Sequence, residues 1–150
     1  MPTETEIAWA AGLFDGEGCV LARLYKVDGE VRGFHPWMQL QMKHEETVRK
    51  FREIVGFGSI SHEKRKENLG KSDVFCVAIA TRQALAAAKL LLPHSFTKRR
   101  SLELLIELQT HIIETPFKKG RGLRMPEDIF KHRESLYLEM KRLNFRGLTV

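Results

Sequence analysis

The segment that most constrains this chain is residues 10–18, a run of small side chains that ends in two carboxylates enclosed by glycines. The alanines favour a helix, and Gly16 and Gly18 are typical of the point where a helix ends. Asp15 and Glu17 therefore lie at the C-terminal end of a helix, where the helix dipole opposes negative charge. The sequence thus predicts that a cation, such as a metal ion, compensates these two carboxylates.

The composition favours a single domain with an acidic partner. The chain has 150 residues and 43% hydrophobic content, which is enough for the core of one ordinary domain. Its 25 lysine and arginine residues exceed its 19 aspartate and glutamate residues, and the net charge of +6 favours a polyanion such as nucleic acid. Residues 93–150 carry 12 basic and 7 acidic side chains, so most of the excess lies in the C-terminal part.

Cysteine usage and hydropathy indicate a reducing compartment. Cys19 and Cys76 lie in apolar, strand-like segments and are too few for a disulfide framework. No apolar run is long enough to span a bilayer, and none follows a basic segment at the N-terminus, so neither a membrane partner nor secretion is expected. We expect an intracellular, cytoplasm-like location, in a bacterial or phage-encoded cytoplasm or an organelle interior.

Hydrophobic periodicity and turn residues predict an α+β domain. Thr3 and Glu6 form a capping-box pattern that begins the first helix, and Gly56 is typical of a helix end. Thr81 is expected to cap a later helix and Pro93 to end it. The predicted order is a helix through residues 7–13, strands 19–27 and 34–43 around a turn region 28–33, a helix over 45–55, strands 59–65 and 73–80, and helices over 84–92, 98–113 and 127–144.

Two parts are expected within this one domain. Residues 1–116 form the core, with the order αββαββαα, and residues 117–150 add a basic loop and a C-terminal helix. The apolar stripe of that last helix is predicted to comprise Ile129, Leu136, Met140 and Leu143. The motif at residues 10–18 occurs once, so a protein that needs two such helices must take the second from another subunit.

One face of the first helix is nearly bare. Ala8, Ala11, Gly12 and Asp15 recur at helical spacing, which lets another helix approach closely. That neighbour is either a helix of the same chain or the same helix of a second copy. In a symmetric pair two Glu17 side chains would converge, and like charges that close require divalent cations between them. Oxygen ligands from carboxylate and glycine carbonyl suit Mg²⁺, and such a cluster supports metal-assisted phosphodiester hydrolysis.

The two hairpins present candidate nucleic-acid contacts. Glutamine and arginine pair bidentately with adenine and guanine, and a curved antiparallel ribbon fits the major groove, although a solvated sheet face would look similar. Counting by twos along the strands gives the candidates Arg23, Tyr25, Trp37, Gln39, Gln41 and Lys43 on the first hairpin, and the weaker candidates Ser61, Arg65 and Asp73 on the second.

A basic run, Lys98, Arg99 and Arg100, opens the helix over residues 98–113. Basic side chains at a helix start oppose the dipole, so the run indicates a nearby anion such as phosphate, with a solvated charge run as the alternative. Arg99 and Arg100 are therefore candidate DNA contacts. His44, at the end of the second strand, is either a group near the metal or a surface or capping residue.

Taken together, residues 6–113 resemble a single-motif LAGLIDADG homing endonuclease, through the motif and through the element order that follows it. The sequence departs from the name motif at Ala10, Phe14, Gly16 and Glu17. The resemblance implies roles in catalysis and metal binding for the following groups: Glu17 and the Gly16 carbonyl oxygen as metal ligands, Asp15 as a structural acid at the helix end, Lys98 near the active-site water network, and His44 near a position often held by glutamine.

The resemblance implies a homodimer with a curved antiparallel DNA-binding sheet. Ala8, Ala11 and Gly12 would form the dimer interface, and Mg²⁺ would be the cofactor. Such an enzyme cuts a long, near-palindromic double-stranded DNA site across the minor groove and leaves short 3′ overhangs, with no small-molecule substrate. Two alternatives stay open: a non-cleaving nucleic-acid-binding protein on the same scaffold, such as an intron maturase or a transcription factor, and a basic interaction domain whose motif is accidental.

Overall fold

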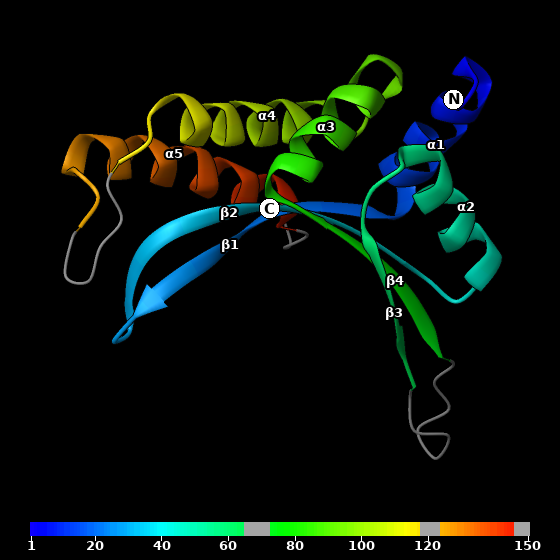
Figure 1. Ribbon diagram of the computed structural model, residues 1–150, viewed down its shortest axis with the longest axis horizontal. Coiled ribbons are helices and arrows are strands. Elements are labelled where there is room, and N and C mark those ends of the chain that lie inside the picture. Colours follow the sequence, from blue (N-terminus) through cyan, green and yellow to red (C-terminus); the bar gives the residue numbers. More distant parts are fainter. Residues whose placement is uncertain (65–72, 118–123, 146–150) are drawn as a thin grey trace, which may run out of the picture.

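Within residues 1–64, 73–117 and 124–145, which the computed structural model describes, the chain forms a four-stranded antiparallel sheet with its helices on one face (Figure 1). The elements follow the order α1 (Glu4–Glu17), β1 (Gly18–Val27), β2 (Glu30–Met42), α2 (Glu45–Val55), β3 (Ser59–Glu63), β4 (Val74–Ala80), α3 (Thr81–Leu91), the 3₁₀ turn η2 (Leu92–His94), α4 (Arg99–Glu114) and α5 (Glu127–Asn144). This order confirms the predicted α+β class, with α5 as the C-terminal extension.

The sheet is built from two hairpins joined side by side. Its strand order is β1-β2-β4-β3, so β2 and β4 pair in the middle. Gly18 lies opposite Leu40, and Gln41 lies opposite Cys76. The sheet bends so that the two hairpins descend on either side of an arch, and the lower face carries no helix (Figure 1). We call this lower face the open face.

The core lies between the sheet and the helices. Alternate strand residues, among them Val20, Met38 and Val77, are fully buried because side chains on successive strand positions point to opposite faces. Phe14 of α1 stacks on Phe51 of α2, with ring centroids 6.1 Å apart. Other large buried side chains are Leu40, Ile79, Leu91, Leu102, Leu104, Leu105 and Leu108.

Two predicted boundaries are wrong for identifiable reasons. The turn of the first hairpin is Asp28 and Gly29 alone rather than residues 28–33, because both have positive φ (52° and 79°) and so close a two-residue turn. Thr81 does not cap α3: Ala80 is the N-cap residue, no side chain caps the helix, and Thr81 itself has a φ of 51°. Strand β4 thus passes directly into α3, and Pro93 lies within η2.

The C-terminal helix α5 packs against β1 and α4. Leu136 and Met140 are buried as predicted, but Leu143 is 41% exposed, and Arg133 is buried in the helix face instead. Asn144 donates a hydrogen bond from its side-chain amide to the carbonyl oxygen of Val20 on β1. Most of the predicted basic loop, residues 118–123, lies outside the described residues. Among the helices that the structure describes, none is long and apolar enough to cross a membrane.

Candidate active site and nucleic-acid interface

The helix α1 runs without a loop into β1, and this junction turns Glu17 outward. Glu17 is the last residue of the helix and is exposed, while Gly18 begins the strand. A Cβ on Gly18 would lie 2.3 Å from the ring of Phe14. Gly18 is therefore required by packing inside the chain. Gly16, by contrast, lies within the helix, and a Cβ there would meet nothing within 4 Å.

Asp15 ties the end of α1 to the segment before α4. Its carboxylate accepts hydrogen bonds from the Ser95 hydroxyl, from the Phe96 amide at 2.8 Å and from the Lys98 amide at 3.0 Å. Partial burial raises the pKa of Asp15, but the hydrogen bonds from Ser95 and from the Phe96, Lys98 and Thr97 amides outweigh it and lower the pKa below its ordinary value. This carboxylate is thus ionised and directed into the protein.

Lys98 supplies a cation to the same helix end. It is the N-cap residue of α4, and its ammonium group donates to the Asp15 carbonyl oxygen at 3.1 Å. A lysine that bonds the last carbonyls of a helix compensates the negative end of the helix dipole. Part of the compensation that the sequence argument assigned to a metal ion therefore comes from Lys98. Ser95, which is buried and bonds Asp15, gave no signal in the sequence.

Glu17 is left as the carboxylate that could bind a metal ion. Among the described residues, none donates a hydrogen bond to its side chain or forms an ion pair with it, and no three histidine, cysteine, aspartate or glutamate side chains gather to hold a metal. The Glu17 carboxylate and the Gly16 carbonyl oxygen are the hard oxygen donors that Mg²⁺ and Ca²⁺ prefer. One protomer offers too few such donors, so a metal site here needs ligands from a second copy or from a substrate phosphate.

The outer face of α1 differs from the predicted one. Ala11 is 1% exposed and packs in the core with Ala10, so it cannot contact a second copy. The exposed positions on successive turns are Trp9, Gly12 and Gly16. A Cβ on Gly12 would meet nothing within 4 Å. Ala8 is partly buried. The small residues of α1 thus lie on two faces of the helix. Ala10 and Ala11 pack in the core, whereas Gly12 and Gly16 lie on an exposed face that we call the bare face.

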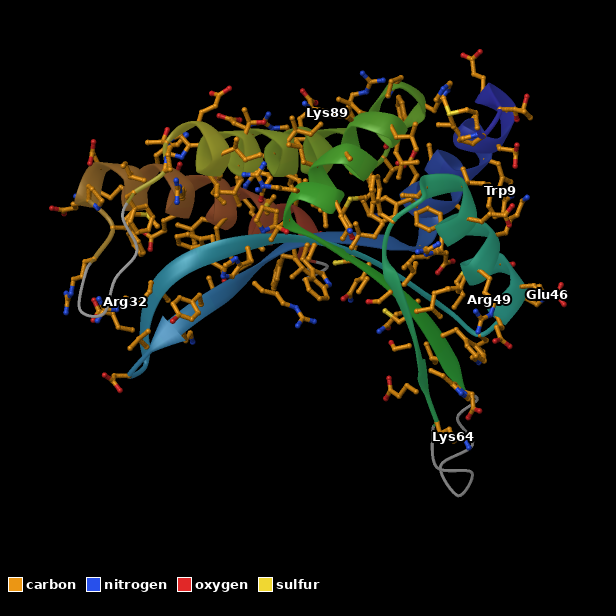
Figure 2. All side chains as sticks on the ribbon, viewed as in Figure 1. Trp9, Arg32, Glu46, Arg49, Lys64 and Lys89 are labelled. Carbon is orange, nitrogen blue, oxygen red and sulfur yellow. The ribbon has the colours of Figure 1, made fainter. Side chains whose placement is uncertain are left out.

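Predicted contacts from both hairpins lie on the open face. Arg23 and Tyr25 alternate with buried residues on β1, and Gln39 lies opposite Cys19 in the next strand. The strand registers place the following side chains on this face: Cys19, Leu21, Arg23, Tyr25, Trp37, Gln39, Gln41, Ser61, Cys76 and Ala78. No helix covers them, and side chains on the underside of the sheet extend into the space below the arch (Figure 2).

Other predicted contacts lie elsewhere. Asp73 pairs with His62 at 2.9 Å, and His62 stacks on Phe75, which alternation places on the face opposite that of Ser61. Lys43 follows the end of β2, and Arg65 lies outside the described residues.

His44 caps α2. Its ring nitrogen Nδ1 accepts from the Thr47 amide at 3.3 Å and lies 2.7 Å from the Thr47 hydroxyl oxygen. The ring is therefore turned toward the first turn of α2, as the capping alternative describes.

The anion beside the basic run at α4 belongs to the protein. Arg100 contacts Glu139 of α5, with Nε and Oε1 2.9 Å apart, and this pairing raises the pKa of Arg100 and lowers that of Glu139. Arg99 donates to the Ser95 carbonyl oxygen at 3.3 Å. Both arginines belong to the first turn of α4, a helix that lies across the sheet from the open face (Figure 1). The structure does not bring them together with the strand contacts, and the expected phosphate is replaced by Glu139.

The arrangement is the fold of the LAGLIDADG homing endonucleases. Comparison with models of known protein families gave no match, and comparison with curated protein sequences gave none either. Solved structures do match. I-CvuI, a homing endonuclease in complex with its target in the presence of Ca, superposes with a TM-score of 0.72 at 16% identity over 97% of this chain and 87% of that one.

Two further structures extend the comparison. An archaeal intron-encoded homing endonuclease complexed with DNA matches with a TM-score of 0.74 at 14% identity, covering 96% of this chain and 87% of that one. The LAGLIDADG homing endonuclease I-SmaMI, bound to cleaved DNA, matches with a TM-score of 0.56 at 17% identity. That match covers 99% of this chain but 46% of the other, which leaves room there for a second copy of the fold.

Proposed function

We propose that this protein is a LAGLIDADG homing endonuclease that hydrolyses phosphodiester bonds of a long, near-palindromic double-stranded DNA site as a homodimer with a divalent metal ion. The observation that carries the proposal is Glu17, an exposed carboxylate without a partner among the described residues. It lies where α1 ends and β1, an outer strand of the sheet, begins. Solved structures of the same fold with DNA bound support the substrate class.

The proposed dimer completes the metal site. Two copies of α1 that pack through Gly12 and Gly16 bring together two Glu17 carboxylates, which one protomer cannot do. The match to I-SmaMI supports this arrangement. It covers 46% of I-SmaMI, so one chain of that protein is about as long as two copies of this chain. A symmetric pair presents the same groups to both DNA strands, which accords with a near-palindromic site and with short 3′ overhangs.

Each residue at the site has a role that its contacts support. Glu17 and the Gly16 carbonyl oxygen would hold Mg²⁺, which supplies an activated water and neutralises charge on the scissile phosphate. Asp15 holds the segment 95–98 against the helix end. Lys98 is anchored by its amide to the Asp15 carboxylate and donates from its ammonium group to the Asp15 carbonyl oxygen, so in the proposed complex its positive charge would act at the helix end that carries Glu17. Side chains of the open face, which include Gln41, bind the groove.

The decisive variant is Glu17→Gln, which keeps the shape of the side chain and removes its charge. We expect it to dimerise and bind duplex DNA as the wild type does and to lose cleavage in Mg²⁺, because an amide is a weak metal ligand. The measurement is strand cleavage of a library of symmetric sites, with gel-shift binding alongside. Glu46→Gln, an exposed acid on α2 that points away from the open face, is the control and retains cleavage (Figure 2).

Two outcomes would overturn the proposal. Cleavage by Glu17→Gln at the wild-type rate in Mg²⁺ removes Glu17 from the reaction. Binding without cleavage by the wild-type protein, over the whole library, leaves the alternative of a non-cleaving nucleic-acid-binding protein.

A further inference from the structure

Three side chains on the open face contact one another rather than projecting independently. Arg23 lies over the Trp37 ring, with its guanidinium carbon 3.7 Å from the ring centroid. Trp37 also donates from its indole nitrogen to the Gln39 side-chain oxygen at 3.1 Å. We propose that Trp37 is a positioning residue for base recognition, which fixes Arg23 and Gln39 so that this part of the open face presents hydrogen-bond donors. The inference rests on the proposed function and specifies how that function selects its DNA site.

The contact with Trp37 orients Arg23. A guanidinium group stacked on an aromatic ring is held flat, and its N–H donors then lie in one plane parallel to the ring. Arg23 is exposed, and no carboxylate among the described residues forms an ion pair with it. Its donor edge is thus available for a partner with two adjacent acceptors. Guanine offers such a pair, O6 and N7, in the major groove.

The second contact of Trp37 decides which end of the Gln39 amide faces outward. An indole N–H is a donor only, so the group that it meets at 3.1 Å must be the amide oxygen. The amide nitrogen is then the end that remains for a base. A glutamine that reads adenine uses its oxygen for the N6 donor and its nitrogen for the N7 acceptor together. A glutamine whose oxygen is committed to Trp37 instead favours the bases that present only acceptors in the major groove, which are guanine and thymine.

Trp37 lies on β2, one of the two middle strands, so the proposed base recognition by Arg23 and Gln39 takes place near the middle of the sheet. Trp37 pairs with Leu21 on one side and with Ala80 on the other, and its side chain is half-buried beneath Arg23. Gly18, next to Glu17, pairs with Leu40, three residues along β2 from Trp37. At about 3.3 Å per residue that separation is about 10 Å, on the order of three base-pair steps. The bases concerned therefore lie a few pairs from the proposed cleavage site.

The test compares the base preferences of variants that separate the two contacts. Randomised duplex DNA is selected for binding to the wild type, Trp37→Phe and Trp37→Leu in EDTA, so that bound DNA stays intact, and is then sequenced. The wild type should prefer guanine about tenfold or more at one position per half-site. Trp37→Phe keeps a ring under Arg23 but has no N–H, so that guanine preference persists while adenine gains at a neighbouring position. Trp37→Leu should lose both preferences.

Controls keep the result interpretable. Thermal unfolding of each variant checks the fold, and Leu138→Ala, an exposed apolar residue of α5, should leave all base preferences unchanged. Base preferences identical in the wild type and both Trp37 variants overturn this inference alone. A wild-type protein that selects no sequence at all overturns both this inference and the proposed function.

Discussion

At the scale of single residues, two carboxylates two positions apart have different environments. Asp15 is surrounded by donors from residues 95–98, whereas Glu17 has none among the described residues. When two carboxylates have such different environments, one can have a structural role while the other remains available for chemistry. The residue pattern around them predicted both acids, and only the family resemblance implied their division into a structural acid and a metal ligand. The local pattern could not show it, because Ser95 and Phe96 reach Asp15 from some 80 positions away in the chain.

Gly18 allows a residue-scale prediction about stability. Gly18→Ala should lower the free energy of unfolding by roughly 1–3 kcal/mol, because the new Cβ would overlap the Phe14 ring and force it to move. The measurement is urea unfolding followed by circular dichroism. Gly33→Ala is the matched control on β2, since its Cβ would meet only Tyr25 at an ordinary 3.8 Å. Equal stabilities of the two variants would contradict the packing role of Gly18.

At the scale of elements, the sequence pattern predicted a helix or strand correctly where a single apolar stripe or a simple alternation defines the buried face. Helix α2 spans Glu45–Val55 and α5 spans Glu127–Asn144, as the apolar periodicity predicted. The alternation of β1 and β2 likewise placed Arg23 and Gln39 on one face. Periodicity did not identify the buried face of an element whose two faces both carry apolar or small side chains. Ala11 illustrates this failure, because its size suits the core as well as a helix contact.

The junction of α4 and α5 contains a buried arginine without a carboxylate partner among the described residues. Arg133 donates to the His111 ring at 3.1 Å and to the Thr115 carbonyl oxygen at 3.0 Å, at the end of α4. Burial lowers the pKa of His111, and the charges of Arg133 and His132 lower it further. Only a neutral His111 can accept from Arg133, so protonation removes the hydrogen bond and adds a like charge.

This junction should therefore weaken in acid. A histidine with a lowered folded pKa stabilises the fold fully above its unfolded pKa of about 6.5, and the stabilisation declines as the pH falls below that value. We expect faster hydrogen exchange in α5 at pH 5 than at pH 7.5 after correction for intrinsic rates. In His111→Gln, whose amide oxygen accepts without titrating, the ratio of the two rates should shrink. A ratio unchanged by that substitution would contradict the role of His111.

At the scale of the whole molecule, the bare face of α1 makes assembly testable. Gly12→Leu should convert the proposed dimer into a monomer without unfolding it, because Gly12 is exposed and a Cβ there meets nothing within 4 Å in its own protomer, while the larger side chain holds two helices apart. Sedimentation equilibrium measures the mass, and cleavage should be lost together with the dimer. Lys89→Leu on α3, which points outward in Figure 2, adds a similar side chain elsewhere and should leave the mass unchanged. A dimeric Gly12→Leu protein would place the interface on another surface.

The helix α5 also determines how far the sheet can grow. β1 is an outer strand, yet α5 packs against it and Asn144 donates a hydrogen bond to the carbonyl oxygen of Val20. The other outer strand, β3, is five residues long and carries serine, histidine and glutamate side chains, which disfavour pairing with a strand of another molecule. Both outer strands thus carry a feature that disfavours pairing with a strand of another molecule, which favours a separate four-stranded sheet in each copy.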